Sequence, residues 1–75
     1  MNQAIIINDD HQYHLKNKYW QCTAMLSGEK VIIKIYSEIL PGQLTQGNKF
    51  DWECEIEDWL ESNEPINNVI ELNMN

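Results

Sequence analysis

The sequence is poor in positive charge, in glycine and in long apolar segments. Five lysines and no arginine stand against twelve acidic residues, which gives a formal net charge of −7. An electric field of this sign repels nucleic acid and anionic membranes, and it attracts basic proteins or cations. We therefore expect no direct DNA or RNA binding. Acidity also serves solubility, so the charge alone does not distinguish a docking surface from a well-solvated one.

Signals for secretion or membrane insertion are also missing from the sequence. The first three residues lead straight into a short apolar run at 4–7, without the basic segment and cleavage site of a signal peptide. No stretch approaches the roughly 20 apolar residues of a membrane span. Cys22 and Cys54 lie far apart, as in cytoplasmic proteins with reduced, core-type thiols. We expect a cytoplasmic protein that makes no membrane contact.

Motifs for catalysis or metal binding are scarce. Three glycines are too few to build a phosphate-binding loop beside their duties in turns. His11 and His14 form an H-x-x-H in a segment with turn composition, where only Cys22 and Cys54 could complete the roughly four ligands of a zinc site. A Cys54 thiolate among neighbouring glutamates would have a raised pKa, which disfavours it as a nucleophile. We expect neither enzymatic activity nor a metal or cofactor.

The length limits what the chain can enclose. A domain of 75 residues, 43% of them hydrophobic, folds around one thin core and buries only about 60% of the surface of its unfolded chain. Little room remains for a substrate cleft of roughly 300 Å³ or more. The sequence therefore predicts a single domain spanning residues 1–75.

Three segments in the first half of the chain are predicted strands. Residues 3–8 form a short apolar run that ends in turn-forming residues, and residues 19–26 and 31–38 alternate between apolar and polar positions. If Gly28 opens a two-residue type II′ turn between the last two, Leu26 lies opposite Val31 and the apolar pairs share one face. Moving the turn back by one residue would place Leu26 opposite Glu29, which we expect to disrupt the core.

The segment 50–61 is ambiguous. Residues 50–57 alternate strictly, which favours a strand, but an extended chain would turn Asp58 inward and Trp59 outward. At about 100° per residue the apolar side chains instead share one helix face, with the acids opposite and only Cys54 on the wrong side. The sequence therefore predicts an amphipathic helix with the apolar face Trp52, Ile56, Trp59 and Leu60.

Capping chemistry suggests the ends of this helix. Asp51 can act as its N-cap, and acidic residues in the first turn interact favourably with the helix dipole. Asn63 and Pro65 provide a stop. Residues 66–74 alternate again and predict a last strand. The expected fold is α+β, a small antiparallel sheet of three to four strands with one acidic amphipathic helix packed on one face.

The acids of the predicted helix and the loop after it are the candidate partner-binding residues. Neighbours at i+3 and i+4 on a helix lie about 5–6 Å apart, close to the phosphate spacing of a nucleic-acid strand, and like-charge i, i+4 pairs each cost a few tenths of a kcal/mol. No lysine relieves this repulsion. The surface is either built to meet a basic groove or only solvated. Its members are Asp51, Glu53, Glu55, Glu57, Asp58, Glu61 and Glu64.

Three segments carry a family resemblance: Met-Asn-Gln-Ala-Ile-Ile-Ile at 1–7, the strand pair Trp-Gln-Cys-Thr-Ala at 20–24 with Gly-Glu-Lys-Val-Ile-Ile at 28–33, and Phe50-Asp51-x-Glu53 before an acidic helix. Across most of its length the chain resembles a family of short bacterial proteins known as a domain of unknown function, series fourteen-eighty-eight. Its middle, residues 39–49, is shorter, where the family tends to carry an extra helical stretch. The resemblance implies a small α+β fold with a late helix, and no activity, cofactor or catalytic residue.

In size and charge the chain also looks like short acidic α+β inhibitors of nucleic-acid-handling machinery, such as phage-encoded anti-CRISPR proteins. We expect a non-catalytic inhibitor or regulator that docks, as a nucleic-acid mimic, on a basic nucleic-acid-binding surface of a partner protein. Tyr19 and Tyr36, on the strand face opposite the apolar side of the hairpin, are expected to add contact area. The alternative is a homodimer formed through an apolar surface or the poorly protected edge of the first strand.

Overall fold

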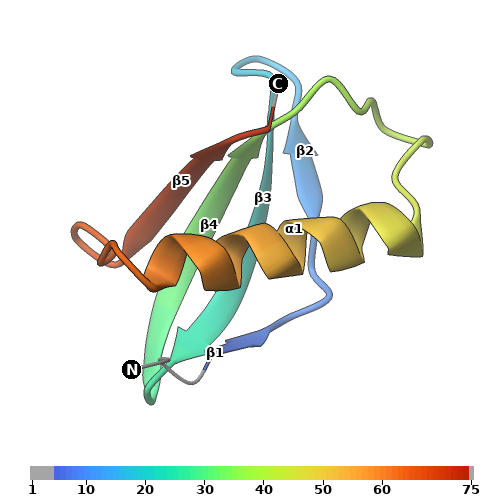
Figure 1. Cartoon of the computed structure of the whole chain (residues 1–75). Helices are drawn as coiled ribbons and strands as arrows, with labels where there is room; N and C mark the ends of the chain where they lie inside the picture. Colours follow the sequence, from blue (N-terminus) through green and yellow to red (C-terminus); the bar gives the residue numbers. More distant parts are fainter. Residues whose placement is uncertain (1–4, 75) are drawn as a thin grey trace.

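One helix lies across one side of a five-stranded sheet in this computed structural model, in which residues 5–74 are described (Figure 1). The sheet has the strand order β1-β3-β4-β5, and β2 also pairs with β3. The elements in chain order are β1 (Ile5–Ile7), β2 (Gln12–His14), β3 (Tyr19–Leu26), β4 (Glu29–Tyr36), α1 (Gln46–Leu60) and β5 (Val69–Asn73). Among the described residues, no helix is both long and apolar enough to cross a membrane.

The predicted α+β class, with one helix on one face of a mostly antiparallel sheet, is confirmed. Two details of the sheet differ from the prediction. β2 adds a strand beyond the three to four expected, where the sequence indicated a turn. β5 pairs with β4 in parallel, because the chain crosses the sheet as α1 between these two strands and so returns in the same direction (Figure 1).

The register of the β3–β4 hairpin differs from the predicted one. Leu26 lies opposite Glu29 and Ala24 lies opposite Val31, so the turn consists of Ser27 and Gly28. Both turn residues have positive φ, 51° and 87°, as a type I′ turn requires, and this turn matches the right-handed twist of the strands. The predicted pairing of Leu26 with Val31 is therefore wrong by two positions.

The shifted register leaves the core intact, contrary to our expectation. Side chains of a strand alternate with a period of two, so a shift of two positions returns every side chain to the same face. The apolar residues of the hairpin still meet under the helix, and Cys22, Ala24, Ile33 and Ile35 have no exposed surface.

β1 and β2 follow each other along the same edge of β3. β1 pairs with residues 24–26 and β2 with residues 19–21. Between them the Asp10 carboxylate replaces a strand partner and accepts hydrogen bonds from the backbone N–H (2.9 Å) and the hydroxyl (2.5 Å) of Thr23. The Asn8 backbone N–H donates to the Thr23 carbonyl at 2.9 Å. This polar interruption anchors residues 8–11 against the sheet.

The helix begins earlier than the sequence suggested. Its N-cap is Thr45, whose Oγ1 accepts a hydrogen bond from the Asn48 N–H (3.1 Å) while Asn48 Oδ1 accepts one from the Thr45 N–H (3.0 Å). This reciprocal pair is a capping box, and it starts the helix within a segment that reads as a polar connector. The predicted N-cap Asp51 is wrong, and the first turn contains no acid that could interact with the helix dipole.

The apolar face of α1 closes the core. Trp52, Ile56 and Leu60 are 5% exposed or less, and Trp59 packs partly buried at the edge of the cluster, which confirms the predicted helix face. Helix α1 ends at Leu60, with a C-cap at Glu61. The last strand is also confirmed, since Ile70 and Leu72 are buried beneath the helix. The core cluster that joins the helix to the sheet includes Ile33, Ile35, Trp52, Ile56, Leu60, Ile70 and Leu72.

Candidate acidic docking site

The predicted partner-binding residues come together as one exposed acidic surface, which we call the acidic face. All seven side chains are exposed, six on α1 or at its C-cap and one in the following loop. The ion pair of the described residues joins Asp9 to Lys49, and Asp9 also lies 3.6 Å from His11, which is charged only when protonated; neither contact involves the acidic face. The acidic face consists of Asp51, Glu53, Glu55, Glu57, Asp58, Glu61 and Glu64.

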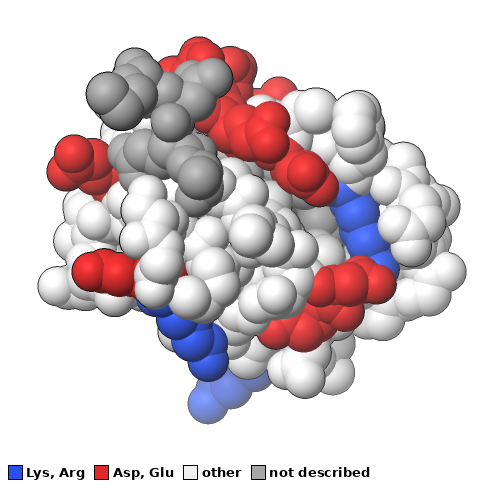
Figure 2. Space-filling model, turned by 90° about the horizontal axis from the view of Figure 1, so that it is seen from below, with Lys and Arg blue, Asp and Glu red and all other residues white. Residues whose placement is uncertain are grey.

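Acidic side chains gather unevenly on the molecular surface. In Figure 2 they form a row from the top of the view toward its right side, and lysine surface meets this row only at its right end, while other lysine surface lies at the lower left. Among the five lysines, only Lys49 belongs to α1. Lys49 stands one turn before Glu53 at the end of the row, but among the described residues no ion pair reaches a carboxylate of the acidic face.

Helical spacing divides the acidic face into two rows. At about 100° per residue, residues 53, 57 and 61 follow one line along α1, and residues 51, 55 and 58 follow another. Phe50 and Cys54, one turn apart, lie between the two rows. Phe50 is 65% exposed. The expected unbroken acidic band is thus divided by a short apolar strip.

Phe50 was missed as a surface residue by the sequence reasoning. With the N-cap placed at Asp51, Phe50 lay ahead of the helix and had no defined direction. The earlier start at Gln46 puts it on the solvent side, between the acidic rows. The signal in the sequence was Thr45 followed three residues later by an amide side chain that can return a hydrogen bond.

Neither thiol is poised for nucleophilic chemistry. Cys22 has no exposed surface, and burial raises its pKa to about 12, with a further contribution from the charge of Asp10. Cys54 is exposed. Its pKa is raised, mainly by incomplete solvation and then by the charges of nearby carboxylates, among which Glu57 contributes most. A thiol reacts as its thiolate, which a raised pKa disfavours. The expectation of two core-type thiols holds for Cys22 and is wrong for Cys54.

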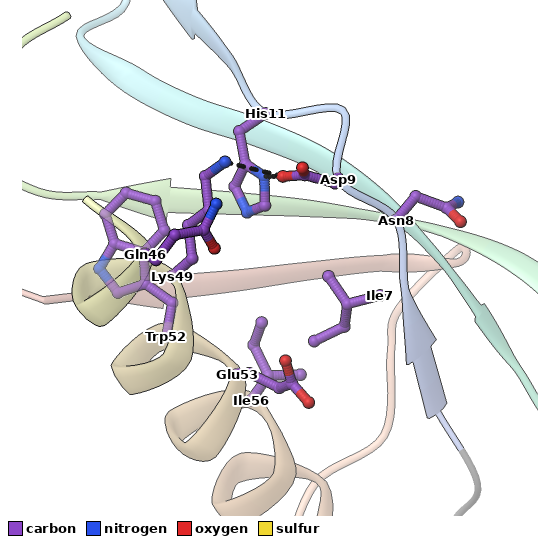
Figure 3. Close-up of a pocket in the computed structure, with 9 residues that line it drawn as sticks. All are labelled: Ile7, Asn8, Asp9, His11, Gln46, Lys49, Trp52, Glu53 and Ile56. Atoms are coloured by element: carbon purple, nitrogen blue, oxygen red, sulfur yellow. Dashed lines mark hydrogen bonds and ion pairs between the residues drawn. The ribbon is translucent and has the colours of Figure 1, made fainter. Parts of the chain in front are cut away.

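A hollow of about 270 Å³ lies beside the acidic face, between residues 7–11 and the first half of α1 (Figure 3). Lys49 Nζ donates a hydrogen bond to Asp9 Oδ1 at 2.7 Å across its rim. Glu53 is the only member of the acidic face among the residues that line it. The lining residues are Ile7, Asn8, Asp9, His11, Gln46, Lys49, Trp52, Glu53 and Ile56.

His11 is the most deeply buried polar side chain described in this hollow. Its side chain is 8% exposed, and its Nδ1 atom is buried without a hydrogen bond, since Asp9 Oδ1 lies 3.6 Å away. The ring centre is 6.0 Å from that of Trp52. Burial, followed by the charge of Lys49, lowers the pKa of His11, while Asp9 and Asp10 act in the opposite direction.

The two histidines of the H-x-x-H do not converge. His11 lines the hollow under α1, whereas His14 stacks on Tyr19 with ring centres 4.7 Å apart. Tyr19 alternates with the core residue Trp20 along β3, so it faces the other side of the sheet. Among residues 5–74, no group of three or more His, Cys, Asp or Glu side chains is placed to share a metal ion.

The predicted aromatic contacts lie on the sheet face opposite the helix, as expected, but they are largely occupied with one another. The rings of Tyr19 and Tyr36 are 5.4 Å apart, and Lys34 Nζ lies 5.5 Å from the centre of the Tyr19 ring. Tyr19 is only 8% exposed. The expectation that it supplies contact area is therefore wrong, while Tyr36 stays half-buried.

No family model matches the chain, and neither a curated protein nor a solved structure does.

Proposed function

We propose that this protein is a non-catalytic binding module whose acidic face docks on a basic, nucleic-acid-binding surface of a partner protein and so inhibits or regulates it. The observation that carries the proposal is the state of the carboxylates. All seven are exposed, and the ion pairs of the described residues leave every one of them unpaired. A basic groove would supply the missing counter-charges.

The repulsion within the acidic face supports this role. Glu53, Glu57 and Glu61 follow one another at i, i+4, and each such like-charge pair costs a few tenths of a kcal/mol in a helix. A cationic partner removes this repulsion on binding, whereas a surface required only for solubility would gain stability from an interspersed lysine. The same carboxylates would steer the partner and give a fast association rate that falls with salt.

Phe50 provides what charge alone does not. Rim charges mainly set the association rate, while binding energy concentrates in desolvated aromatic or apolar contacts near the centre of an interface. Phe50 is 65% exposed and lies at the N-terminal end of the acidic face, next to Asp51. We expect it to supply an apolar contact at that end of the docked helix.

Charge reversal tests the proposal. A triple variant with Glu53→Lys, Glu57→Lys and Glu61→Lys is compared with a control carrying Glu29→Lys, Glu38→Lys and Glu71→Lys, which has the same net charge but leaves α1 intact. The readout is displacement of a labelled oligonucleotide from nucleic-acid-binding proteins captured from the native cell. We expect the first variant to lose displacement at low salt and the control to keep it. Equal loss of displacement in both variants would mean that the effect depends only on net charge. Full retention of displacement by the first variant would refute the proposal.

A homodimer is the second candidate, and exposed apolar residues on the open face of the sheet favour it. Ile6 is 70% exposed, and its cross-strand partner Met25 is 38% exposed. If this face forms the dimer, sedimentation velocity will show association that persists in salt and is abolished by Ile6→Lys together with Met25→Lys. A monomer at all concentrations up to about 1 mM would exclude it.

A further inference from the structure

We propose that the hollow between residues 7–11 and α1 is an anchor site for a single arginine side chain of the basic partner. This inference rests on the proposed function and makes it more specific, because it assigns one residue type to one place at the edge of the acidic face. The arguments concern the acceptors around the hollow, its net charge and its apolar lining.

Hydrogen-bond acceptors surround the hollow without donors to match them. The carboxylate of Glu53 has no partner among the described residues, and Asp9 uses only Oδ1, for Lys49. A guanidinium carries five N–H donors in a planar fork and no acceptor. Such a set of acceptors fits a guanidinium better than it fits an amide or an anion.

His11 adds an observation that does not depend on the carboxylates. Figure 3 shows its ring pointing from the sheet side toward the helix, between Asp9 and Lys49. Its Nδ1 atom is buried and makes no hydrogen bond. Leaving a buried polar atom unsatisfied is unfavourable. Because Nδ1 faces the Asp9 carboxylate at 3.6 Å, the proton of the neutral ring belongs on Nδ1, and Nε2 is the bare nitrogen that can accept a hydrogen bond from an incoming N–H group.

The charge of the hollow matches one cation. Asp9 and Glu53 contribute two negative charges and Lys49 contributes one positive charge, while His11 is neutral in its favoured form. One negative charge therefore remains for a ligand to neutralise. Lys49 does not fill this role itself, because its ammonium group is held at the rim by Asp9 at 2.7 Å.

The apolar lining favours arginine over lysine. Ile7, Trp52 and Ile56 lie along the inner wall of the hollow, where the aliphatic stem of a long side chain can pack. A guanidinium is more weakly hydrated than an ammonium and loses less on leaving water. Its planar fork also pairs with a carboxylate through two parallel hydrogen bonds. Both properties suit a partly enclosed site with Glu53 at its mouth.

The test uses two isosteric probes and the intact ¹⁵N-labelled protein. N-acetyl-arginine amide carries the guanidinium, and N-acetyl-citrulline amide replaces it with a neutral urea of nearly the same shape. We expect arginine-dependent ¹H–¹⁵N shift changes to cluster at residues 8–11 and 46–53, together with a change in the His11 imidazole signals. The citrulline probe is expected to leave these signals in place. Equal responses to both probes would overturn the proposal.

Two single variants separate this site from the acidic face as a whole. Glu53→Gln and Glu57→Gln each remove one carboxylate from the same row of α1, but only Glu53 lines the hollow. We expect Glu53→Gln to weaken arginine binding about tenfold, corresponding to roughly 1.4 kcal/mol, and Glu57→Gln to change it less than about twofold. Equal weakening, with shifts spread along α1, would refute the arginine site and leave acidic docking standing. The docking proposal would be refuted instead if the protein binds the arginine probe but the triple charge reversal has no effect on nucleic-acid displacement.

Discussion

His11 occupies a place where burial and charge act on the same imidazole in opposite directions. Burial and the nearby Lys49 ammonium disfavour the protonated ring, while Asp9 and Asp10 favour it. Burial and Lys49 have the larger effect, so the pKa of His11 is lowered from its ordinary value of 6.5. The folded protein therefore holds this histidine neutral at a pH where the unfolded chain already begins to protonate it.

This imbalance predicts an acid-sensitive step in stability. Because the unfolded chain binds a proton at a higher pH than the folded one, the free energy of unfolding falls as the pH decreases from about 6.5 through the lowered pKa of His11. His11→Gln is expected to remove this step. Chemical denaturation between pH 5 and 7.5 measures it for both proteins, and NMR titration of the His11 ring gives its pKa directly. A midpoint at or above 6.5 in the folded protein would contradict the prediction.

The acid step at His11 is separable from that of the carboxylates. The pKa of Asp9 is lowered first by the hydrogen bond from Lys49, and that of Asp10 by its hydrogen bonds with Thr23. Groups of this kind contribute stability that is fully present above their ordinary value, near 4, and is lost only below it. Loss of stability between pH 5 and 6.5 therefore reports on His11 rather than on these aspartates.

Among the elements, the hairpin shows what patterning can and cannot settle. Alternation of apolar residues identified β3, β4 and their buried face, because a period of two follows from the strand itself. It did not settle the register, since shifts by an even number of positions preserve the faces. Backbone geometry of the turn decided it, through the positive φ of Ser27 as well as Gly28. Serine in this conformation is uncommon, so residue preferences did not predict this turn.

The helix and the site show a similar division. Helical periodicity in residues 52–60 predicted the buried face of α1 and the exposure of the acids within that stretch, because both follow from 3.6 residues per turn. The helix start was missed because a capping box between Thr45 and Asn48 outweighed the low helix propensity of Gly47 and Asn48. The hollow with His11 was not predictable, since it depends on residues 8–11 meeting α1 in space. No local pattern encodes that meeting.

At the scale of the whole molecule, charge is distributed unequally between the two sides of the sheet. The acidic face lies on the helix side, while Lys30 and Lys34 alternate along β4 with buried Val31 and Ile33 and so point away from the helix. Lys34 is further engaged with the ring of Tyr19. On this open face Lys34 lies beside Glu71, so the charges there largely offset one another, and a basic partner would be attracted mainly to the helix side. The fold thus orients the partner before contact.

The same distribution predicts that salt stabilises the folded protein. The radius of gyration is 11.8 Å, whereas the Debye length is about 30 Å at 0.01 M salt and about 8 Å at 0.15 M. At low salt every carboxylate of the acidic face therefore repels all the others, and at 0.15 M only near neighbours interact. With several like-charge pairs each costing a few tenths of a kcal/mol, we expect the free energy of unfolding to rise by roughly 1 kcal/mol between these concentrations.

The single variant Glu57→Lys is the matched comparison for this effect. It converts the two i, i+4 repulsions of the row, Glu53 with Glu57 and Glu57 with Glu61, into attractions, which salt weakens instead of relieving. Thermal or urea unfolding in sodium chloride is expected to give a rising dependence for the natural sequence and a clearly smaller one for the variant. If the variant is also more stable than the natural protein at low salt, the natural acids lower the stability of the fold. Selection for a docking surface would produce this result. A natural protein indifferent to salt would mean that its carboxylates do not interact, and the repulsion that a basic partner is proposed to relieve would be absent.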